Sequence, residues 1–118
     1  MTPFSFPDLR GKHLVITGIT RGIGRALLPD LLAQGLTITA LSRGMDRMEA
    51  IRSELGASPE QLRLIECDLS RPESVEAAGR AVLDLGLPLD AVLHNAAIDP
   101  RHRFENTELL FWENLLQV

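Results

Sequence analysis

A glycine-rich segment at residues 17–24, TGITRGIG, constrains the fold of this chain more than any other feature. A mostly apolar run precedes it at residues 13–16, and the residues from 25 onward have the apolar spacing of a helix. A glycine-rich turn between a strand and a helix lets the backbone close on a pyrophosphate, and the unpaired N–H groups of the helix N-terminus point at it. The segment therefore predicts a dinucleotide-binding site. The competing interpretation is a glycine-rich turn that binds no ligand.

Strand and helix patterns alternate along the chain, and short connections join them. Such alternation is typical of a parallel sheet, whose right-handed crossovers place helices on both faces. The sequence thus predicts one domain over residues 1–118, with an α/β fold: a Rossmann-type doubly wound parallel sheet of about four strands in the order 3-2-1-4. The expected strands are residues 13–17, 37–41, 63–67 and 91–94, and the expected helices are residues 22–34, 46–55, a third that ends before Gly86, and 108–118.

Several residues are expected to shape these helices. Gly35 stands where a left-handed cap ends the first helix. Pro29 inside that helix removes a hydrogen bond to the carbonyl of Arg25, which predicts a kink or a weakened turn. Residues 70–73, SRPE, have the spacing of a capping box and predict the start of the third helix. The apolar face of that helix comprises Val75, Ala78, Val82 and Leu85.

The glycine spacing Thr-Gly-x-x-x-Gly-x-Gly resembles that of the short-chain dehydrogenase/reductase family, and two further motifs match the family in order and spacing. Asp68 and Leu69 follow the third expected strand, and residues 94–97, HNAA, follow the fourth. The resemblance implies that Asp68 faces the adenine amino group, that Leu69 lies beside the ring and that Asn95 ties the strand end to the sheet. For Asp68 the alternative is a carboxylate at a helix N-terminus, favoured by the helix dipole.

Two residues of the HNAA motif depart from the Asn-Asn-Ala-Gly of the family. Ala97 replaces the glycine and places a Cβ where the backbone of the family passes close to the nicotinamide ribose. His94 is interpreted as a packed histidine at the strand end, with no catalytic role.

The residues after the second expected strand indicate which dinucleotide binds. In NAD-binding units an acidic residue about 20 positions past the glycines holds the ribose 2′-hydroxyl, but residues 41–44, LSRG, contain no carboxylate. The Arg43 guanidinium and the Ser42 hydroxyl suit a 2′-phosphate instead, and Arg21 adds a second cation. The resemblance implies NADP(H), because family members with basic residues at both positions prefer it; Arg43 alone would also fit a solvated loop charge. The residues expected to bind the cofactor are Gly18, Thr20, Arg21, Gly22, Ile23, Gly24, Ser42, Arg43, Asp68, Leu69, Asn95, Ala96 and Ala97.

The catalytic residues of the resembled family have no counterpart in this sequence. The family uses a Tyr-x-x-x-Lys pair, a serine and an asparagine in the second half of a longer chain, whereas these 118 residues include no tyrosine and one lysine, Lys12. The resemblance implies the cofactor-binding half of an oxidoreductase that exchanges hydride between nicotinamide and a carbonyl or alcohol carbon, and these residues alone are expected to be inactive. The alternatives are a non-catalytic NADP(H)-binding or assembly module, and a methyltransferase that uses S-adenosylmethionine, which would need an acid near Ser42.

Composition and charge argue against several other classes. A net charge of −4 disfavours nucleic-acid binding. No apolar run reaches the ~18 residues of a membrane span, and the first residues lack the basic and apolar regions of a signal peptide. The single cysteine, Cys67, forms neither an internal disulfide nor a metal cluster and is expected to be a packed thiol. We therefore expect a cytoplasmic protein that binds no metal.

The last expected helix, residues 108–118, predicts self-association. Its apolar residues cover about half of a helical wheel, which is wider than the ~100° stripe that one sheet face needs. The edge of the fourth strand would also be unpaired, and such edges favour association. We therefore expect a homo-oligomer formed through residues 108–118 and the edge of the fourth strand.

Overall fold

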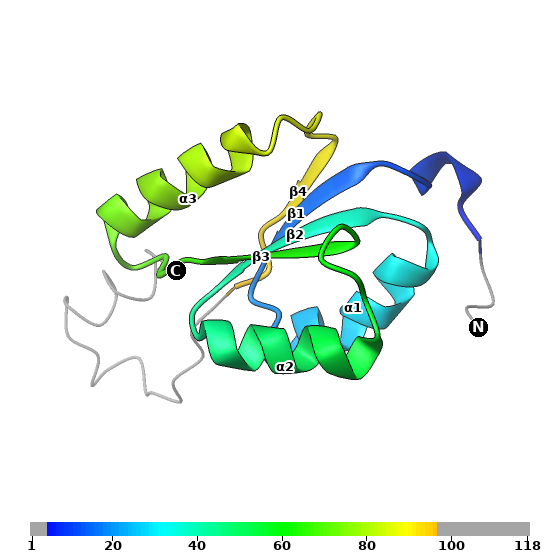
Figure 1. Cartoon of the computed structure of the whole chain (residues 1–118), viewed down its shortest axis with the longest axis horizontal. Coiled ribbons are helices and arrows are strands. Elements are labelled where there is room, and N and C mark those ends of the chain that lie inside the picture. Colours follow the sequence, from blue (N-terminus) through cyan, green and yellow to red (C-terminus); the bar gives the residue numbers. More distant parts are fainter. Residues whose placement is uncertain (1–4, 97–118) are drawn as a thin grey trace, which may run out of the picture.

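The computed structural model describes residues 5–96 and places four strands in one parallel sheet (Figure 1). The strand order β3-β2-β1-β4 confirms the predicted order and fold class. Every neighbouring pair is parallel, so the carboxyl ends of all four strands lie at one edge of the sheet. The strands are β1 His13–Thr17, β2 Thr37–Ser42, β3 Leu62–Glu66 and β4 Ala91–Leu93, and the helices are η1 Pro7–Leu9, α1 Gly22–Ala33, α2 Met45–Leu55 and α3 Pro72–Asp84.

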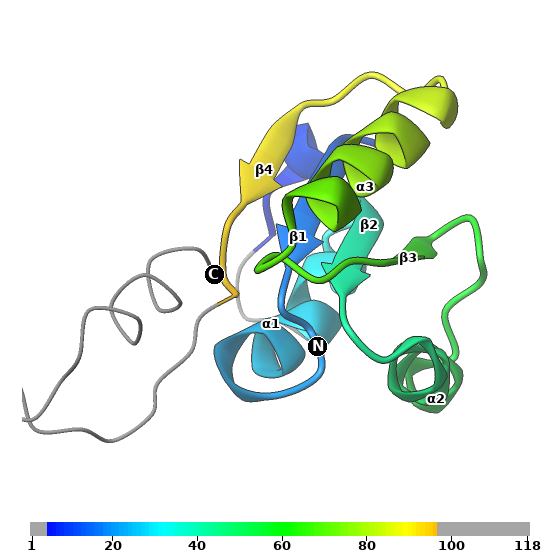
Figure 2. The ribbon, with the colours of Figure 1, turned by 90° about the vertical axis from the view of Figure 1, so that its left-hand side faces the viewer.

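Helices cover both faces of the sheet, with α1 and α2 on one face and α3 on the other (Figures 1 and 2). The main core lies between the sheet and the layer of α1 and α2, where alternate residues of the strands meet apolar residues of the helices. Every residue of β1 is buried, because this central strand has a neighbour on each side and helices over both faces. The buried members of the core are Leu14, Ile16, Ile19, Leu28, Leu36, Ile38, Ala40, Met48, Ile51 and Leu62.

The first helix is continuous despite its internal proline. α1 runs through Pro29 without interruption, so the predicted kink does not divide it. Pro29 is exposed, while Leu28 on the same helix is fully buried in the core. Packing of the apolar face therefore keeps the segment helical although one backbone hydrogen bond is missing. Gly35 has the predicted left-handed conformation, with a φ of 83°.

The predicted capping box at residues 70–73 is wrong. α3 begins at Pro72 with Arg71 as its N-cap residue, and no side chain caps its N-terminus. The helix thus begins one residue later than the capping-box spacing requires, so Ser70 precedes the N-cap position. Its hydroxyl donates to Asp68 Oδ1 at 2.7 Å. The predicted apolar face is partly covered, since Ala78 is buried whereas Val75 is 42% exposed.

Hydrogen bonds hold the amino-terminal end of β1 to the connection that precedes β4. The His13 N–H donates to Asp90 Oδ2 at 2.8 Å, and the Asp90 N–H donates to the His13 carbonyl at 3.1 Å. The buried His13 ring lies 2.7 Å from Thr39 Oγ1 and 3.1 Å from the Pro88 carbonyl. These contacts set the position of β4 beside β1, and so bring residues 94–96 next to the glycine segment.

The fourth strand has a neighbour on one side only among the described residues. Ala91 and Val92 are exposed, and Val92 keeps 61% of its surface accessible. The helix predicted at residues 108–118 and the predicted site residue Ala97 lie outside the described residues. Within residues 5–96, no helix has both the length and the hydropathy needed to cross a membrane.

Candidate cofactor-binding site

Most of the residues predicted to bind a cofactor lie in four loops at the carboxyl edge of the sheet; Ser42 ends β2, and residues 22–24 begin α1. The four loops are residues 18–21 after β1, 43–44 after β2, 67–71 after β3 and 94–96 after β4. Ligands of open α/β sheets bind at this edge, at the point where the strand order reverses. The reversal falls between β1 and β4, because β2 and β3 extend to one side of β1 and β4 lies on the other.

Two glycines of the segment are required by close packing. Gly18 has a φ of 76°, and a Cβ built on it would lie 2.8 Å from the Ala96 Cα. A Cβ on Gly24 would overlap the carbonyl oxygen of Gly18 and lie 2.6 Å from Asn95 Nδ2. The loop after β1 therefore packs directly against α1 and against the loop after β4.

Gly22, the first residue of α1, faces open space. It has a φ of 66°, and no atom lies within 4 Å of the position that a Cβ would take. The neighbouring Ile23 is 69% exposed. The first N–H groups of an α-helix have no partner within the helix. The start of α1 thus combines unpaired donors with the room that an approaching pyrophosphate needs.

Hydrogen bonds from the end of β2 and from the loop after β4 hold the glycine segment in this conformation. The Ile19 N–H donates to Ser42 Oγ at 3.0 Å. Asn95 Nδ2 donates to the Gly18 carbonyl, also at 3.0 Å. Because Ser42 is only 7% exposed, its hydroxyl supports the loop from within the fold. A contact between Ser42 and a 2′-phosphate stays a prediction.

Thr17, the last residue of β1, ties the loop after β4 to the sheet. Its hydroxyl oxygen accepts hydrogen bonds from the N–H groups of Asn95 and Ala96, both at 3.0 Å. The predicted tie between Asn95 and the sheet is therefore confirmed. The same hydroxyl lies 3.3 Å from His94 Nδ1. His94 itself is exposed and lies just beyond β4, which ends at Leu93, so the prediction of a packed histidine is wrong.

Arg21 and Arg43 carry unpaired positive charges at this edge. Both residues are exposed, and neither forms an ion pair with any other residue in the range 5–96. Two nearby arginines differ in this respect: Arg25 pairs with Glu54 at 3.1 Å, and Arg71 pairs with Glu73 in the first turn of α3 at 2.8 Å. The guanidinium groups of Arg21 and Arg43 are therefore available to bind an anion.

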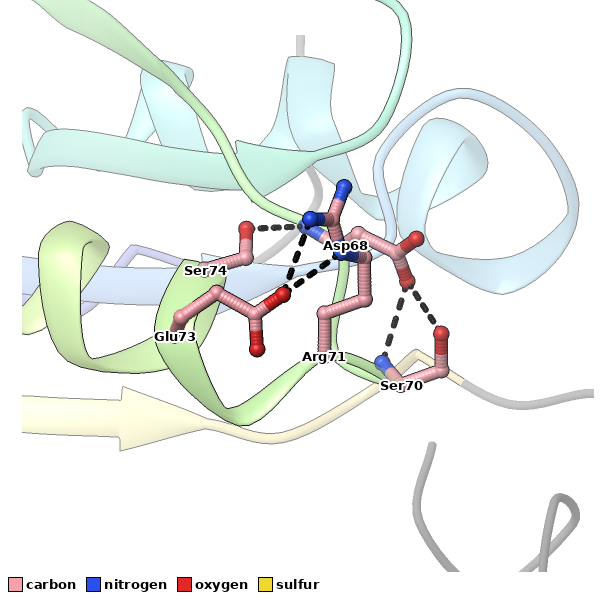
Figure 3. A network of polar contacts seen from close by, with 5 residues as sticks. All are labelled: Asp68, Ser70, Arg71, Glu73 and Ser74. Atoms are coloured by element: carbon pink, nitrogen blue, oxygen red, sulfur yellow. Dashed lines mark hydrogen bonds and ion pairs between the residues drawn. The ribbon is translucent and has the colours of Figure 1, made fainter.

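Asp68 is held in place by residues that precede and begin α3 (Figure 3). Ser70 donates to Asp68 Oδ1 from its N–H at 3.0 Å and from its hydroxyl at 2.7 Å. The Asp68 N–H donates to Ser74 Oγ at 2.9 Å. The hydrogen bonds from Ser70 lower the pKa of the Asp68 carboxyl, and the positive charges of Arg43 and Arg71 lower it further. Oδ2 receives no hydrogen bond from the described residues, so an ionised oxygen is available for an outside donor.

Acid should remove the contribution of the Asp68–Ser70 contacts to stability. The pKa of Asp68 lies below the ~3.9 of an unfolded aspartate. The ionised group therefore stabilises the fold above that pH, and its contribution is lost as the pH falls through the folded-state pKa. We expect Ser70→Ala to lower the free energy of unfolding at neutral pH, and to lower it less at about pH 2. Urea titrations at the two pH values measure the difference.

The control for that experiment is Ser53→Ala, which changes an exposed serine on α2. The pKa of Glu73 is also lowered, by its own backbone N–H and by Arg71, but Glu73 is present in all three proteins and cancels in the comparison. An equal effect of Ser70→Ala at both pH values would contradict the assignment.

Cys67 is a buried thiol, 2% exposed, at the end of β3. Burial raises its pKa, and a thiol with a raised pKa is a poor nucleophile and a poor metal ligand. The predicted packed thiol is confirmed. Across residues 5–96, no three metal-ligating side chains are grouped as a site.

Sequence reasoning missed one acidic residue at this edge. Glu66 ends β3, and its Oε1 accepts a hydrogen bond from the Gly44 N–H at 3.3 Å. The strand register pairs Glu66 with Ser42, the residue before Arg43. Its place at the end of the neighbouring strand was the available signal, because the carboxyl ends of parallel strands share one edge.

The strand order, the glycine segment and the open start of α1 define a Rossmann-type dinucleotide-binding unit. Comparison with known families agrees: the family model described as short chain dehydrogenase matches residues 12–118. The chain therefore belongs to the short-chain dehydrogenase family. This membership decides against the methyltransferase interpretation.

Curated relatives include a D-xylose 1-dehydrogenase from Caulobacter vibrioides, 30% identical over all 118 residues of this chain and 46% of its own length. A 3-oxoacyl-acyl-carrier-protein reductase from Aquifex aeolicus is 32% identical over 93% of this chain and 45% of its own length. The chain thus spans slightly less than half the length of these relatives.

Solved structures of the same family superpose on the chain. An alcohol dehydrogenase from the archaeon Thermococcus sibiricus, complexed with 5-hydroxy-NADP, has a TM-score of 0.80 and 31% identity over 92% of this chain and 47% of its own. A metagenomic short-chain oxidoreductase in complex with NADP has a TM-score of 0.79 and 25% identity over 92% of this chain and 50% of its own.

Proposed function

We propose that this chain binds NADP(H) in preference to NAD(H), as the cofactor-binding part of a short-chain oxidoreductase. The observation that carries the proposal is the pair of exposed guanidinium groups, Arg21 and Arg43, that have no ion-pair partner among residues 5–96. Arg43 occupies the loop after β2, where an NAD-binding unit carries an acid for the ribose 2′-hydroxyl. A guanidinium binds phosphate through charge-assisted hydrogen bonds, often two at once.

The residues present fit a dinucleotide. The space beside Gly22 and the N–H groups at the start of α1 suit the pyrophosphate. The open Oδ2 of Asp68 would accept a hydrogen bond from the adenine amino group, and Leu69 would supply an apolar contact to the ring. Two solved relatives contain NADP or 5-hydroxy-NADP, which supports the same choice of cofactor.

For the whole protein we propose oxidoreductase activity. The bound nicotinamide supplies or accepts a hydride, which a carbonyl or alcohol carbon exchanges with it. The residues of this chain bind and orient the cofactor: the glycine segment holds the pyrophosphate, Asp68 the adenine, and Arg21 and Arg43 the 2′-phosphate. No catalytic role is assigned to any of them. The cytoplasmic location and the single domain over residues 1–118 stay predictions.

Calorimetric titration of the purified chain with NADPH and with NADH tests the choice of cofactor. Each well-formed charge-assisted pair is worth roughly 1.5–3 kcal/mol. We therefore expect NADPH to bind at least about tenfold more tightly than NADH at low salt. Equal affinities would contradict the preference for NADP(H), and binding of neither would contradict the proposed function.

A non-catalytic assembly role is the second candidate, and the edge of β4 favours it. Val92 is 61% exposed, and β4 has no outer neighbour among the described residues. We propose that the chain forms homo-oligomers through this edge and residues 108–118. Light scattering should detect oligomers of the wild-type chain and a smaller species for Val92→Glu, because a charge opposes pairing at a strand edge. A wild-type monomer would rule out this assembly.

A further inference from the structure

Glu66 places a carboxylate where the proposed phosphate site needs positive charge. It is an exposed residue at the end of β3, and its Oε1 accepts the hydrogen bond of the Gly44 N–H at 3.3 Å. Gly44 directly follows Arg43 and is the N-cap residue of α2. As a glycine it has no side chain with which to cap the helix. The carboxylate from the neighbouring strand thus occupies the N–H donor beside the arginine.

The strand register places Glu66 beside the loop after β2. Ser42 and Glu66 are Cα partners in the parallel pair of β2 and β3. A side chain at the end of β3 therefore lies beside the loop that begins with Arg43. The start of α2 also attracts anions, because a helix N-terminus carries a partial positive charge and unpaired N–H groups. Glu66 is the carboxylate that bonds to the N-cap N–H of α2, and Asp46 adds a negative charge in the first turn of the helix.

A 2′-phosphate bound by Arg43 would meet this carboxylate as a competitor. The Gly44 N–H already donates to Glu66, so the phosphate would have to displace the Glu66 carboxylate or bind without that hydrogen bond. The two anions also repel each other, because like charges at a protein surface interact more unfavourably the closer they lie. A ribose 2′-hydroxyl has no charge and suffers no such repulsion; carboxylates commonly hold this hydroxyl in NAD-binding units.

We propose that Glu66 is a specificity-determining residue that weakens the discrimination between NADP(H) and NAD(H). Its charge opposes that of Arg43, and its carboxylate occupies the adjacent backbone donor. The inference rests on the proposed function of this edge as a dinucleotide site. The selectivity between NADP(H) and NAD(H) would then depend on the end of β3 as well as on residues 41–44.

The test compares Glu66→Gln with Glu60→Gln in the full 118-residue chain. Glutamine keeps the length and the acceptor oxygen of Glu66 and removes only its charge. Glu60 is also exposed but precedes β3 at the opposite end. The two sites are separated by at least ~13 Å of strand, which exceeds the Debye length of about 8 Å at physiological salt.

Dissociation constants for NADPH and NADH are measured by calorimetry at low and high salt. We expect Glu66→Gln to tighten NADPH binding about three- to tenfold at low salt, less at high salt, and to leave NADH binding no tighter. Glu60→Gln should change the ratio of the two constants less than twofold. An unchanged ratio in Glu66→Gln, or an equal change in both variants, would overturn the role of Glu66 while the wild-type chain still binds. A wild-type chain that binds neither dinucleotide would overturn the proposed function itself.

Discussion

Replacing Gly24 with alanine is expected to abolish dinucleotide binding and to lower the free energy of unfolding by about 2–4 kcal/mol. A Cβ at this position would overlap the Gly18 carbonyl oxygen and crowd Asn95 Nδ2. Both groups belong to one hydrogen bond of 3.0 Å that joins the loops after β1 and β4. The added methyl group would therefore separate α1 from the loop that it packs against, and the N–H groups at its start would no longer face the proposed pyrophosphate.

Urea unfolding and calorimetric titration with NADPH measure the two effects. The matched control is Gly79→Ala on α3, where no atom lies within 4 Å of the new Cβ. Alanine in an open helical position should stabilise the chain by roughly 0.5–1 kcal/mol. A Gly24→Ala variant that behaves like Gly79→Ala would show that the close approach of the two loops is not needed.

Changing Arg43 to aspartate is expected to reverse the cofactor preference. The substitution removes a guanidinium that has no ion-pair partner in residues 5–96, and it places a carboxylate where NAD-binding units carry one. Loss of a charge-assisted bond, together with new repulsion of the phosphate, should change the ratio of NADPH to NADH affinity by about 10²–10³-fold. Titration of the variant with both dinucleotides gives this ratio.

Lys12→Asp serves as the control for Arg43→Asp. It makes the same change of charge at an exposed residue just before β1, at the opposite edge of the sheet. The ratio of affinities should stay within about twofold of the wild type, because salt screens charges at that separation. If Lys12→Asp shifted the ratio as far as Arg43→Asp does, net charge rather than a phosphate contact at Arg43 would govern the preference.

Arg43 and Glu66 have opposite effects on the charge of the proposed phosphate site. Arg43 follows β2 and favours phosphate, whereas Glu66 ends β3 and bonds to the residue after Arg43. The gain in NADPH affinity from Glu66→Gln should be smaller in the Arg43→Asp background than in the wild type, because residues that share a partner are coupled. The size of this difference measures how strongly the two loops act on the same phosphate.

Local patterns in the sequence predicted the strand order and placed the ends of the described strands and α-helices within a residue or two, but they missed the short helix η1. Alternating strand and helix segments, with glycines after the helices, depend on residues near one another in the chain, so the sequence is sufficient for them. The capping-box prediction was wrong although it also depends on neighbouring residues. The helix begins at Pro72 with Arg71 as its N-cap residue, so Ser70 lies one position too early to cap it and contacts Asp68 instead.

The sequence by itself determined the class of fold, the glycine segment that starts α1 and the family to which the chain is similar. Only the tertiary structure decided how the site is held: Ser42 supports the loop at Ile19, Asn95 bonds to Gly18, and Glu66 reaches Gly44. These partners lie more than 20 positions apart in the sequence. Their contacts depend on strand register and on the approach of separate loops, which arise only when the parallel sheet forms and brings all its carboxyl ends to one edge.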